Sequence, residues 1–275
     1  MTSLVAWVGA DSRGPSSLNI AADSRITWGA GTSVSYHWDQ GKKVFASSSV
    51  PLVIGFVGDV LFPALVLPGV IDRIDRGVFR PDGSVVEGVI AALRRGWRDY
   101  PPAERRDVNV YVAYRTGEGM SCRFRLTSLS HRSGASADWT ARDVPVPSSS
   151  AFLKIDGSGK TAVKTALDAW QATSAADTSR AVFSGFVDAV TGRVDPDSGG
   201  APQLGCIYRT GPGRLLGIIH DSQRYFAGAH LIGDEALDGI EWRNALFERA
   251  DGHTKQRLPG AQPQPRPTKR AEHSD

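Results

Sequence analysis

The sequence lacks the features that mark several large classes of protein. Its 275 residues contain no apolar run close to the roughly 18–20 residues that a membrane-spanning helix needs, so no membrane association is expected. Cys122 and Cys206 are the only cysteines, which argues against a disulfide framework and excludes a cysteine-rich metal site. The six histidines are scattered without a close helical pair, so no zinc site is predicted.

The chain also lacks a basic face. Its formal net charge is +3, and residues 252–275 alone carry five Lys or Arg against two acidic residues, which is +5 − 2 = +3. The remainder is therefore formally neutral, and no nucleic-acid partner is predicted. No basic segment precedes the first apolar run, so we predict no secretory signal and expect a cytoplasmic protein.

What is present is an ordinary globular composition, with 41% hydrophobic and 22% charged residues. We predict one large domain over residues 1–250, long enough for a sizeable core. Residues 251–275 are rich in proline and poor in large apolar side chains. Such a segment cannot bury enough surface to offset its ordering entropy, so we predict a disordered basic tail.

Hydrophobic periodicity predicts strands first, helices in the middle of the chain, and strands again. Apolar residues at helical spacing predict an amphipathic helix over residues 85–100, with further helices from 162 and from 181. Short apolar runs bounded by turn residues predict strands at residues 4–8, 18–22, 25–28, 43–46, 52–57, 108–114, 123–126, 153–155, 204–208 and 215–219. This order is typical of sheets with helices stacked on them.

Thr2 stands directly after the initiator methionine and directly before a predicted strand. A small second residue permits removal of Met1, so we expect a mature N-terminus at Thr2. That residue would then carry both a hydroxyl and a free α-amine, whose unperturbed pKa near 8 suits a base at neutral pH. A hydroxyl needs such a base beside it to become a useful nucleophile.

Five short motifs follow Thr2 in a fixed order. They are AADSRIT at residues 21–27, GKKVF at 41–45, VIGFVGD at 53–59, GSG at 157–159 and DPDSGG at 195–200. The sequence thereby resembles proteasome β-subunits and their simpler bacterial relatives, which carry A-x-[DE]-x-R-x-T, G-K-[KR]-[VLI]-[FY], G-x-x-G-D, Gly-Ser-Gly and D-x-x-S-G-G. The resemblance is clear over residues 2–60 and returns at the last two motifs, whereas residues 144–156 and everything after residue 220 have no match.

The resemblance implies an α+β fold, namely a four-layer αββα sandwich with two antiparallel sheets between helix layers. It implies a threonine endopeptidase that hydrolyses polypeptides inside a homo-oligomeric ring and needs no metal or organic cofactor. An ATPase unfoldase as partner is left open.

The resemblance also implies catalytic roles. Thr2 would attack the peptide carbonyl, Lys43 would stabilise the developing alkoxide, and Asp23 would hold Lys43 charged and oriented. Lys42 is a neighbouring alternative, but the alternation of the following strand favours Lys43. The residues expected around the α-amine and a water are Ser158, Asp195 and Ser198.

Four further positions are implied for substrate binding. The backbone N–H of Gly55 would face the oxyanion, where preorganised donors contribute strongly to catalysis. Thr27 and Val57 would pair with the substrate backbone as an added strand. Val53 would shape the pocket for the residue before the scissile bond, which favours apolar substrate side chains.

Two other motifs suggest different functions for the chain. Residues 154–161, KIDGSGKT, suggest a phosphate-binding loop, but Lys154 stands where that motif needs a glycine. DSGG at residues 197–200 also occurs around the nucleophile of chymotrypsin-like proteases, which need a histidine base. His37 is the only upstream candidate, and its YHWD context is unlike that family.

Two alternatives remain within the resembled class. The chain could be a catalytically silent wall subunit of a proteasome-like ring, although such subunits usually lose the threonine, the lysine or the aspartate. It could also be an amidase of the same nucleophile class that acts on a small molecule.

Overall fold

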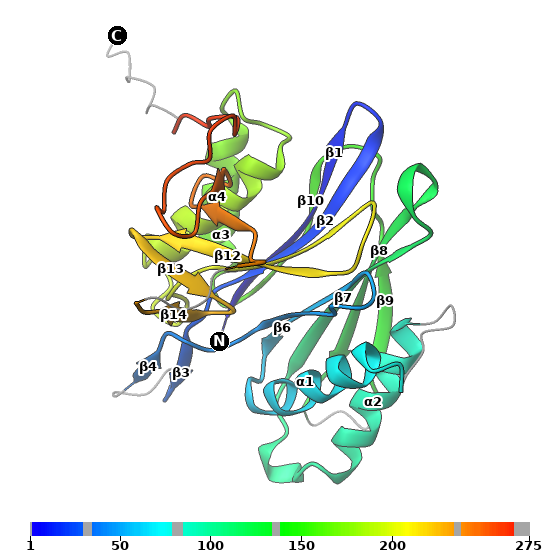
Figure 1. The fold of residues 1–275 in the computed structure, drawn as a ribbon. Helices are drawn as coiled ribbons and strands as arrows, with labels where there is room; N and C mark the ends of the chain where they lie inside the picture. Colours follow the sequence, from blue (N-terminus) through cyan, green and yellow to red (C-terminus); the bar gives the residue numbers. More distant parts are fainter. Residues whose placement is uncertain (1, 30–34, 79–84, 134–137, 234–237, 267–275) are drawn as a thin grey trace.

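The fold is mixed α+β, as the sequence predicts. The computed structural model describes residues 2–29, 35–78, 85–133, 138–233 and 238–266, and these form antiparallel sheets and four α-helices (Figure 1). In the described residues, the one parallel strand pairing joins β12 (Arg214–His220) and β15 (Trp242–Asn244).

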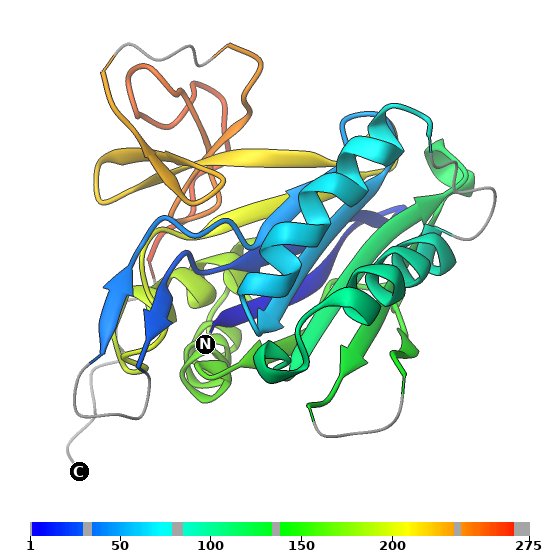
Figure 2. The same cartoon turned by 90° about the horizontal axis from the view of Figure 1, so that it is seen from below.

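The first large sheet has five strands in the order β5-β6-β7-β8-β9. The strands are β5 (Val44–Ala46), β6 (Leu52–Gly58), β7 (Val108–Thr116), β8 (Arg123–His131) and β9 (Thr140–Val144). On one face lie α1 (Leu61–Asp75) and α2 (Val85–Asp99), which pack around Phe62 and Trp97 (Figure 2).

The second large sheet has nine strands, with β10-β1-β2-β11-β12-β13-β14 as its main path and β15 and β16 beside β12. Its further strands are β1 (Ser3–Asp11), β2 (Gly14–Ala22), β10 (Ala151–Gly157), β11 (Gln203–Tyr208), β13 (Gln223–Phe226), β14 (Ala229–Leu231) and β16 (Arg249–Ala250). Helices α3 (Lys160–Gln171) and α4 (Ser179–Thr191) pack on its outer face, around Trp7 and Phe183.

The two large sheets face each other across a shared apolar core. Leu4 and Ile20 of the nine-stranded sheet lie in one cluster with Val53 and Tyr111 of the five-stranded sheet. Strand β1 is therefore covered on both faces, which explains why its sequence is continuously apolar instead of alternating. A separate hairpin of β3 (Ile26–Trp28) and β4 (Tyr36–Trp38) projects from the body (Figure 2).

Most predicted elements have their structural counterparts at similar positions. Helix α1 contains two prolines and runs through both without a break. Pro63 lies in the first turn, where a missing N–H costs nothing, and Pro68 is accommodated inside the helix.

Residues 251–266, which belong to the predicted disordered tail, contact the body of the protein. Gln264 is buried, its backbone N–H donates to Glu248 at 2.6 Å, and its side chain lies 3.3 Å from the Ser184 hydroxyl of α4. Arg257 forms an isolated bridge with Ala250. Specific polar contacts therefore hold part of a segment whose composition predicts disorder. Residues 267–275 lie outside the described residues.

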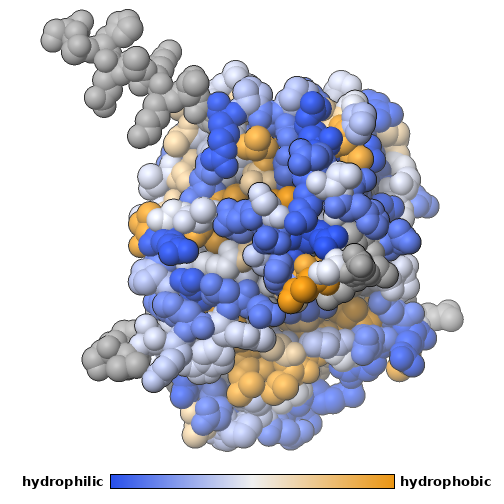
Figure 3. All heavy atoms as spheres, turned by 60° about the vertical axis from the view of Figure 1, so that its left-hand side comes forward, coloured by the Kyte–Doolittle hydropathy of each residue, from blue (hydrophilic) through white to orange (hydrophobic). Residues whose placement is uncertain are grey.

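One side of the surface is mostly hydrophilic, with apolar residues in separate patches (Figure 3). None of the helices in the described residues is long and apolar enough to cross a membrane.

Candidate active site

The site forms where β1 begins and β2 ends. Antiparallel pairing sets Leu4 opposite Ala22, so the residues just before β1 lie beside those just after β2. Ser3 and Asp23 are bonded twice, since the Ser3 N–H donates to Asp23 Oδ1 at 2.9 Å and the Asp23 N–H donates to the Ser3 carbonyl at 3.1 Å. Thr2 is buried and adjoins this pair along the chain.

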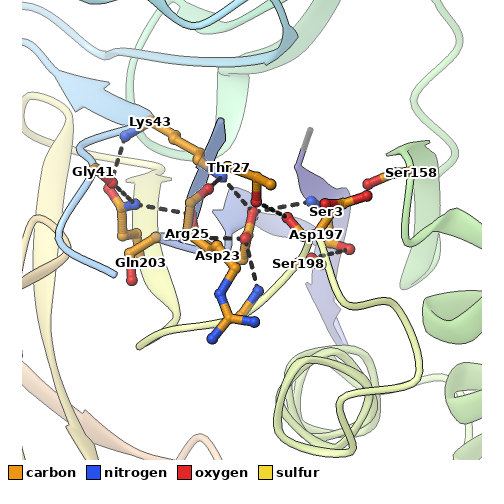
Figure 4. Close-up of polar contacts among 12 residues, drawn as sticks. Ser3, Asp23, Arg25, Thr27, Gly41, Lys43, Ser158, Asp197, Ser198 and Gln203 are labelled. Atoms are coloured by element: carbon orange, nitrogen blue, oxygen red, sulfur yellow. Dashed lines mark hydrogen bonds and ion pairs between the residues drawn. The ribbon is translucent and has the colours of Figure 1, made fainter. Parts of the chain in front are cut away.

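Lys43 reaches the same point from the residue before β5. Its Nζ lies 2.8 Å from Asp23 Oδ1 and 2.5 Å from the Arg25 carbonyl oxygen, and both charged side chains have no exposed surface (Figure 4). Burial lowers the pKa of Lys43, while the carboxylate of Asp23 opposes that shift. Lys43 therefore releases its proton more readily than a surface lysine, yet it keeps a partner for its charged form.

The carboxylate of Asp23 is held from several directions. Besides Ser3 and Lys43, it accepts the Arg25 N–H at 3.2 Å and the Gly199 N–H at 3.0 Å, both on Oδ2. These donors come from chain segments that are far apart in sequence. Because a carboxylate so surrounded cannot rotate, it fixes the direction from which it meets Lys43.

The last two motifs close the other side of the site. The Ser158 hydroxyl donates to Asp195 Oδ2 at 2.7 Å, and the Ser198 hydroxyl donates to Ser3 Oγ at 2.6 Å. Gly159 allows this approach, since a Cβ there would lie 2.0 Å from Ser3 Oγ. Ser158, Asp195 and Ser198 are thus brought together around the start of β1.

A cleft of about 920 Å³ opens at this end of the two sheets. Thr2, Thr27, Val57 and Ser158 all line it. The Thr27 hydroxyl lies 3.4 Å from the Asp197 carbonyl oxygen, which ties β3 to the DPDSGG segment. Four predicted site residues therefore share one cavity with room for an extended chain.

Two predicted substrate-binding residues do not belong to the lining of that cleft. Gly55 pairs with Val44 and Tyr111 inside the sheet, and a Cβ there would lie 2.7 Å from Ile20 Cγ2. Val53 is buried in the core between the sheets.

Their position along β6 accounts for this placement. Residues 53, 55 and 57 share the inner face of β6, but only the last of them reaches the cleft. Gly55 and Val53 therefore lie deeper along β6 than the cleft, and the roles implied for them as oxyanion donor and pocket wall stay predictions.

Sequence reasoning missed other polar residues at the site. Asp156 lines the cleft and accepts hydrogen bonds from the Asn109 amide at 2.7 Å and from the Tyr111 hydroxyl. Gln203 lies behind the Asp23–Lys43 pair and bonds to both segments (Figure 4). Their signal is a polar residue at the end of an apolar strand, which gains meaning only once the opposing strands are known.

Residues of the phosphate-loop-like and chymotrypsin-like motifs form hydrogen bonds to other residues of the chain. In the suggested phosphate loop, Ser158 is bonded to Asp195 and Gly159 packs on Ser3. The Ser198 hydroxyl is bonded to Ser3, whereas His37 is exposed and paired with Thr27 in the β3–β4 hairpin.

The described residues contain no group of His, Cys, Asp or Glu that could hold a metal ion. Comparison of the chain with models of known protein families and with curated proteins gives no match in either case.

Proposed function

We propose that the protein is a threonine endopeptidase of the proteasome β-subunit kind, in which Thr2 becomes the nucleophile after removal of Met1. The observation that carries this proposal is the fully buried Lys43–Asp23 pair, 2.8 Å apart, beside the residue that follows Thr2. Burying two charges is costly, and a buried lysine whose pKa is lowered beside a specific charge partner is typical of functional sites.

The arrangement of layers supports the same proposal. Two sheets face each other, and each carries two helices on its outer face. We infer from this that the fold is the αββα sandwich of N-terminal-nucleophile hydrolases. The start of β1 then lies between the sheets at the mouth of the cleft, where a peptide could reach it.

The proposed reaction uses groups that lie at the start of β1. The free α-amine of Thr2 accepts the proton of its own hydroxyl as the oxygen attacks the carbonyl carbon, and it later returns a proton to the leaving amine. The ammonium of Lys43 stabilises the negative charge on the attacking oxygen. Ser158, Asp195 and Ser198 orient the amine and a water that hydrolyses the acyl-enzyme.

Substitution of Thr2 tests the proposal. Thr2→Ala removes the attacking oxygen and little bulk, so the protein should fold normally and lose hydrolysis of fluorogenic peptides, while Thr2→Ser should retain part of it. A peptide epoxyketone should react with both the hydroxyl and the amine of Thr2 and give a cyclic adduct detectable by mass. Full activity of Thr2→Ala would show that another residue is the nucleophile.

Maturation gives a second test. Intact mass should show a chain shorter by one methionine, because a Thr2 that is still acylated by Met1 has no free amine to act as base. A chain that keeps Met1 and still cleaves peptides would contradict the mechanism.

We further propose a cytoplasmic homo-oligomeric ring that acts on polypeptides, to which an ATPase unfoldase would deliver unfolded substrates. Light scattering should then give a mass many times 29.5 kDa. A ring that cleaves no peptide and takes up no epoxyketone would instead be a silent wall subunit. A monomer that hydrolyses only small amides would identify an amidase.

A further inference from the structure

Gln203 is a buried amide that touches both segments of the charged pair. It begins β11 opposite Ala22, is 1% exposed, and uses both ends of its side chain. Its Nε2 donates to the Asp23 carbonyl oxygen at 3.0 Å and to the Gly41 carbonyl oxygen at 2.7 Å. Its Oε1 accepts the Lys43 N–H at 3.0 Å.

One side chain therefore spans the backbones that carry Asp23 and Lys43. Such a bridge sets the distance between the two segments independently of the side-chain contact between Nζ and Oδ1. We propose that Gln203 is a positioning residue for the Asp23–Lys43 pair, and that the turn between β13 and β14 holds Gln203 in place. The catalytic part of this inference rests on the function proposed above.

The turn meets Gln203 through Gly228. A Cβ at this position would lie 3.1 Å from Gln203 Nε2 and 2.9 Å from the Gly41 carbonyl oxygen. Its φ of +87° is one that glycine adopts readily, and the preceding Ala227 also has a positive φ of 51°. The backbone of this turn is therefore pressed against the amide and the carbonyl that the amide binds.

This contact gives the chain after His220 a direct connection to the site. Strands β13 and β14 lie at the edge of the nine-stranded sheet, on the side of the molecule that also carries the β3–β4 hairpin (Figure 1). Displacement of their turn would free Gln203 and let Lys43 shift relative to Asp23. Misplacement by about 1 Å at a catalytic group can cost on the order of 10²-fold in rate.

The first experiment replaces the amide without changing its length. Gln203→Met removes the bridge, and Gln264→Met is the matched control, because Gln264 is also buried but bonds to Glu248 and Ser184 instead. We expect Gln203→Met to lower kcat for a fluorogenic peptide by about 10–100-fold with KM within about threefold. Gln264→Met should leave both constants unchanged even where it lowers the melting temperature.

Amide hydrogen exchange provides a readout that does not depend on activity. Because the Lys43 N–H donates to Gln203 Oε1, peptides covering residues 41–46 should lose protection in Gln203→Met and keep it in Gln264→Met. If the parent protein proves inactive, the proposed function fails, and exchange alone still decides whether Gln203 holds this segment.

The second experiment changes a neighbour of Gln203 and leaves every hydrogen-bonding group in place. It keeps the inference testable if Gln203→Met fails to fold. Gly228→Ala places a methyl group against Gln203, whereas Gly239→Ala imposes similar backbone strain at φ +80° with nothing within 4 Å. We expect Gly228→Ala alone to lower kcat, by about tenfold, and to expose residues 41–46 to exchange. Unchanged kcat and unchanged exchange in both Gln203→Met and Gly228→Ala would overturn the inference, as would equal losses in the two control variants.

Discussion

The first 60 residues and the residues after 220 contribute to one site in different ways. The first segment supplies Thr2, Asp23 and Lys43, each inside a short motif that can be recognised in the sequence alone. The later segment contributes through its β13–β14 turn, which lies against the amide that bridges Asp23 and Lys43. The groups that react in the proposed mechanism follow local patterns, whereas the contacts that hold them come from distant parts of the chain.

If the first 60 residues supply the reacting groups, substitutions there should reduce activity the most. Lys43→Met should lower kcat by about 10²–10³-fold, because the attacking oxygen loses its neighbouring cation. Lys42→Met is the matched control, since Lys42 is exposed and its Nζ lies over the Phe45 ring at 4.8 Å. Peptide hydrolysis by the folded variants measures both. Equal losses of activity in the two variants would show that the motif does not identify Lys43 as the lysine that acts on the attacking oxygen.

Asp23→Asn should affect stability as well as rate. It leaves Lys43 buried without its counter-charge, and breaking a buried ion pair costs about 3–5 kcal/mol. The rate should fall less than in Lys43→Met, because the lysine remains in place.

The cost of Asp23→Asn should also depend on pH in a defined direction. Burial lowers the pKa of Lys43, and Asp23 is the main group that opposes this shift, so the pKa of Lys43 falls further in the variant. Between that lowered pKa and the ordinary value near 10.4, the unfolded chain binds more protons than the folded one, and stability rises with pH. Urea unfolding from pH 6 to 9 should show that the variant's loss of unfolding free energy relative to the parent shrinks, by at most about 1.4 kcal/mol per pH unit. A loss of unfolding free energy that stays constant or grows with pH would contradict the role of Asp23 as the counter-charge of Lys43.

Much of the fold and of the site follows from local sequence, and the remainder depends on three-dimensional pairing. The strands around Leu4 and Leu18 and the helix that contains Leu93 are visible as apolar patterns, and Asp23 and Lys43 as motifs. The depth of Gly55 and Val53 in the sheet could not be predicted, because a motif does not state where along a strand a residue becomes covered. Gln203 could not be found, because its partner Lys43 is 160 residues away.

The segment after residue 220 should respond mainly in stability. Glu248 is buried and accepts the Asn244 amide at 2.7 Å and the Gln264 N–H at 2.6 Å. Glu248→Gln replaces one acceptor oxygen by a donor, so we expect a loss of about 1–3 kcal/mol in unfolding free energy with kcat unchanged. The exposed Glu87→Gln serves as control and should cost less than about 0.5 kcal/mol. A fall in kcat of Glu248→Gln would show that the whole later segment, and not only its β13–β14 turn, acts on the site.

The smallest effect is expected from a charged pair that belongs to the first segment but lies at its surface. Arg25 Nε and Asp39 Oδ1 are 2.8 Å apart, and the side chain of Asp39 is 42% exposed. The hydrogen bond from Arg25 lowers the pKa of Asp39, so the pair contributes stability above the ordinary carboxyl pKa near 3.9 and loses it as pH falls through the lowered value. Solvent screening keeps this contribution small, and Asp39→Asn should cost about 0.5–1 kcal/mol at pH 7. Chemical denaturation at pH 7 and near pH 2 should show this cost largely disappearing in acid, with kcat at pH 7 within about twofold of the parent. A larger loss of kcat would mean that Arg25, which packs beneath Gly199, transmits its position to Asp23, and that the surface of the first segment is as important for the site as its buried pair.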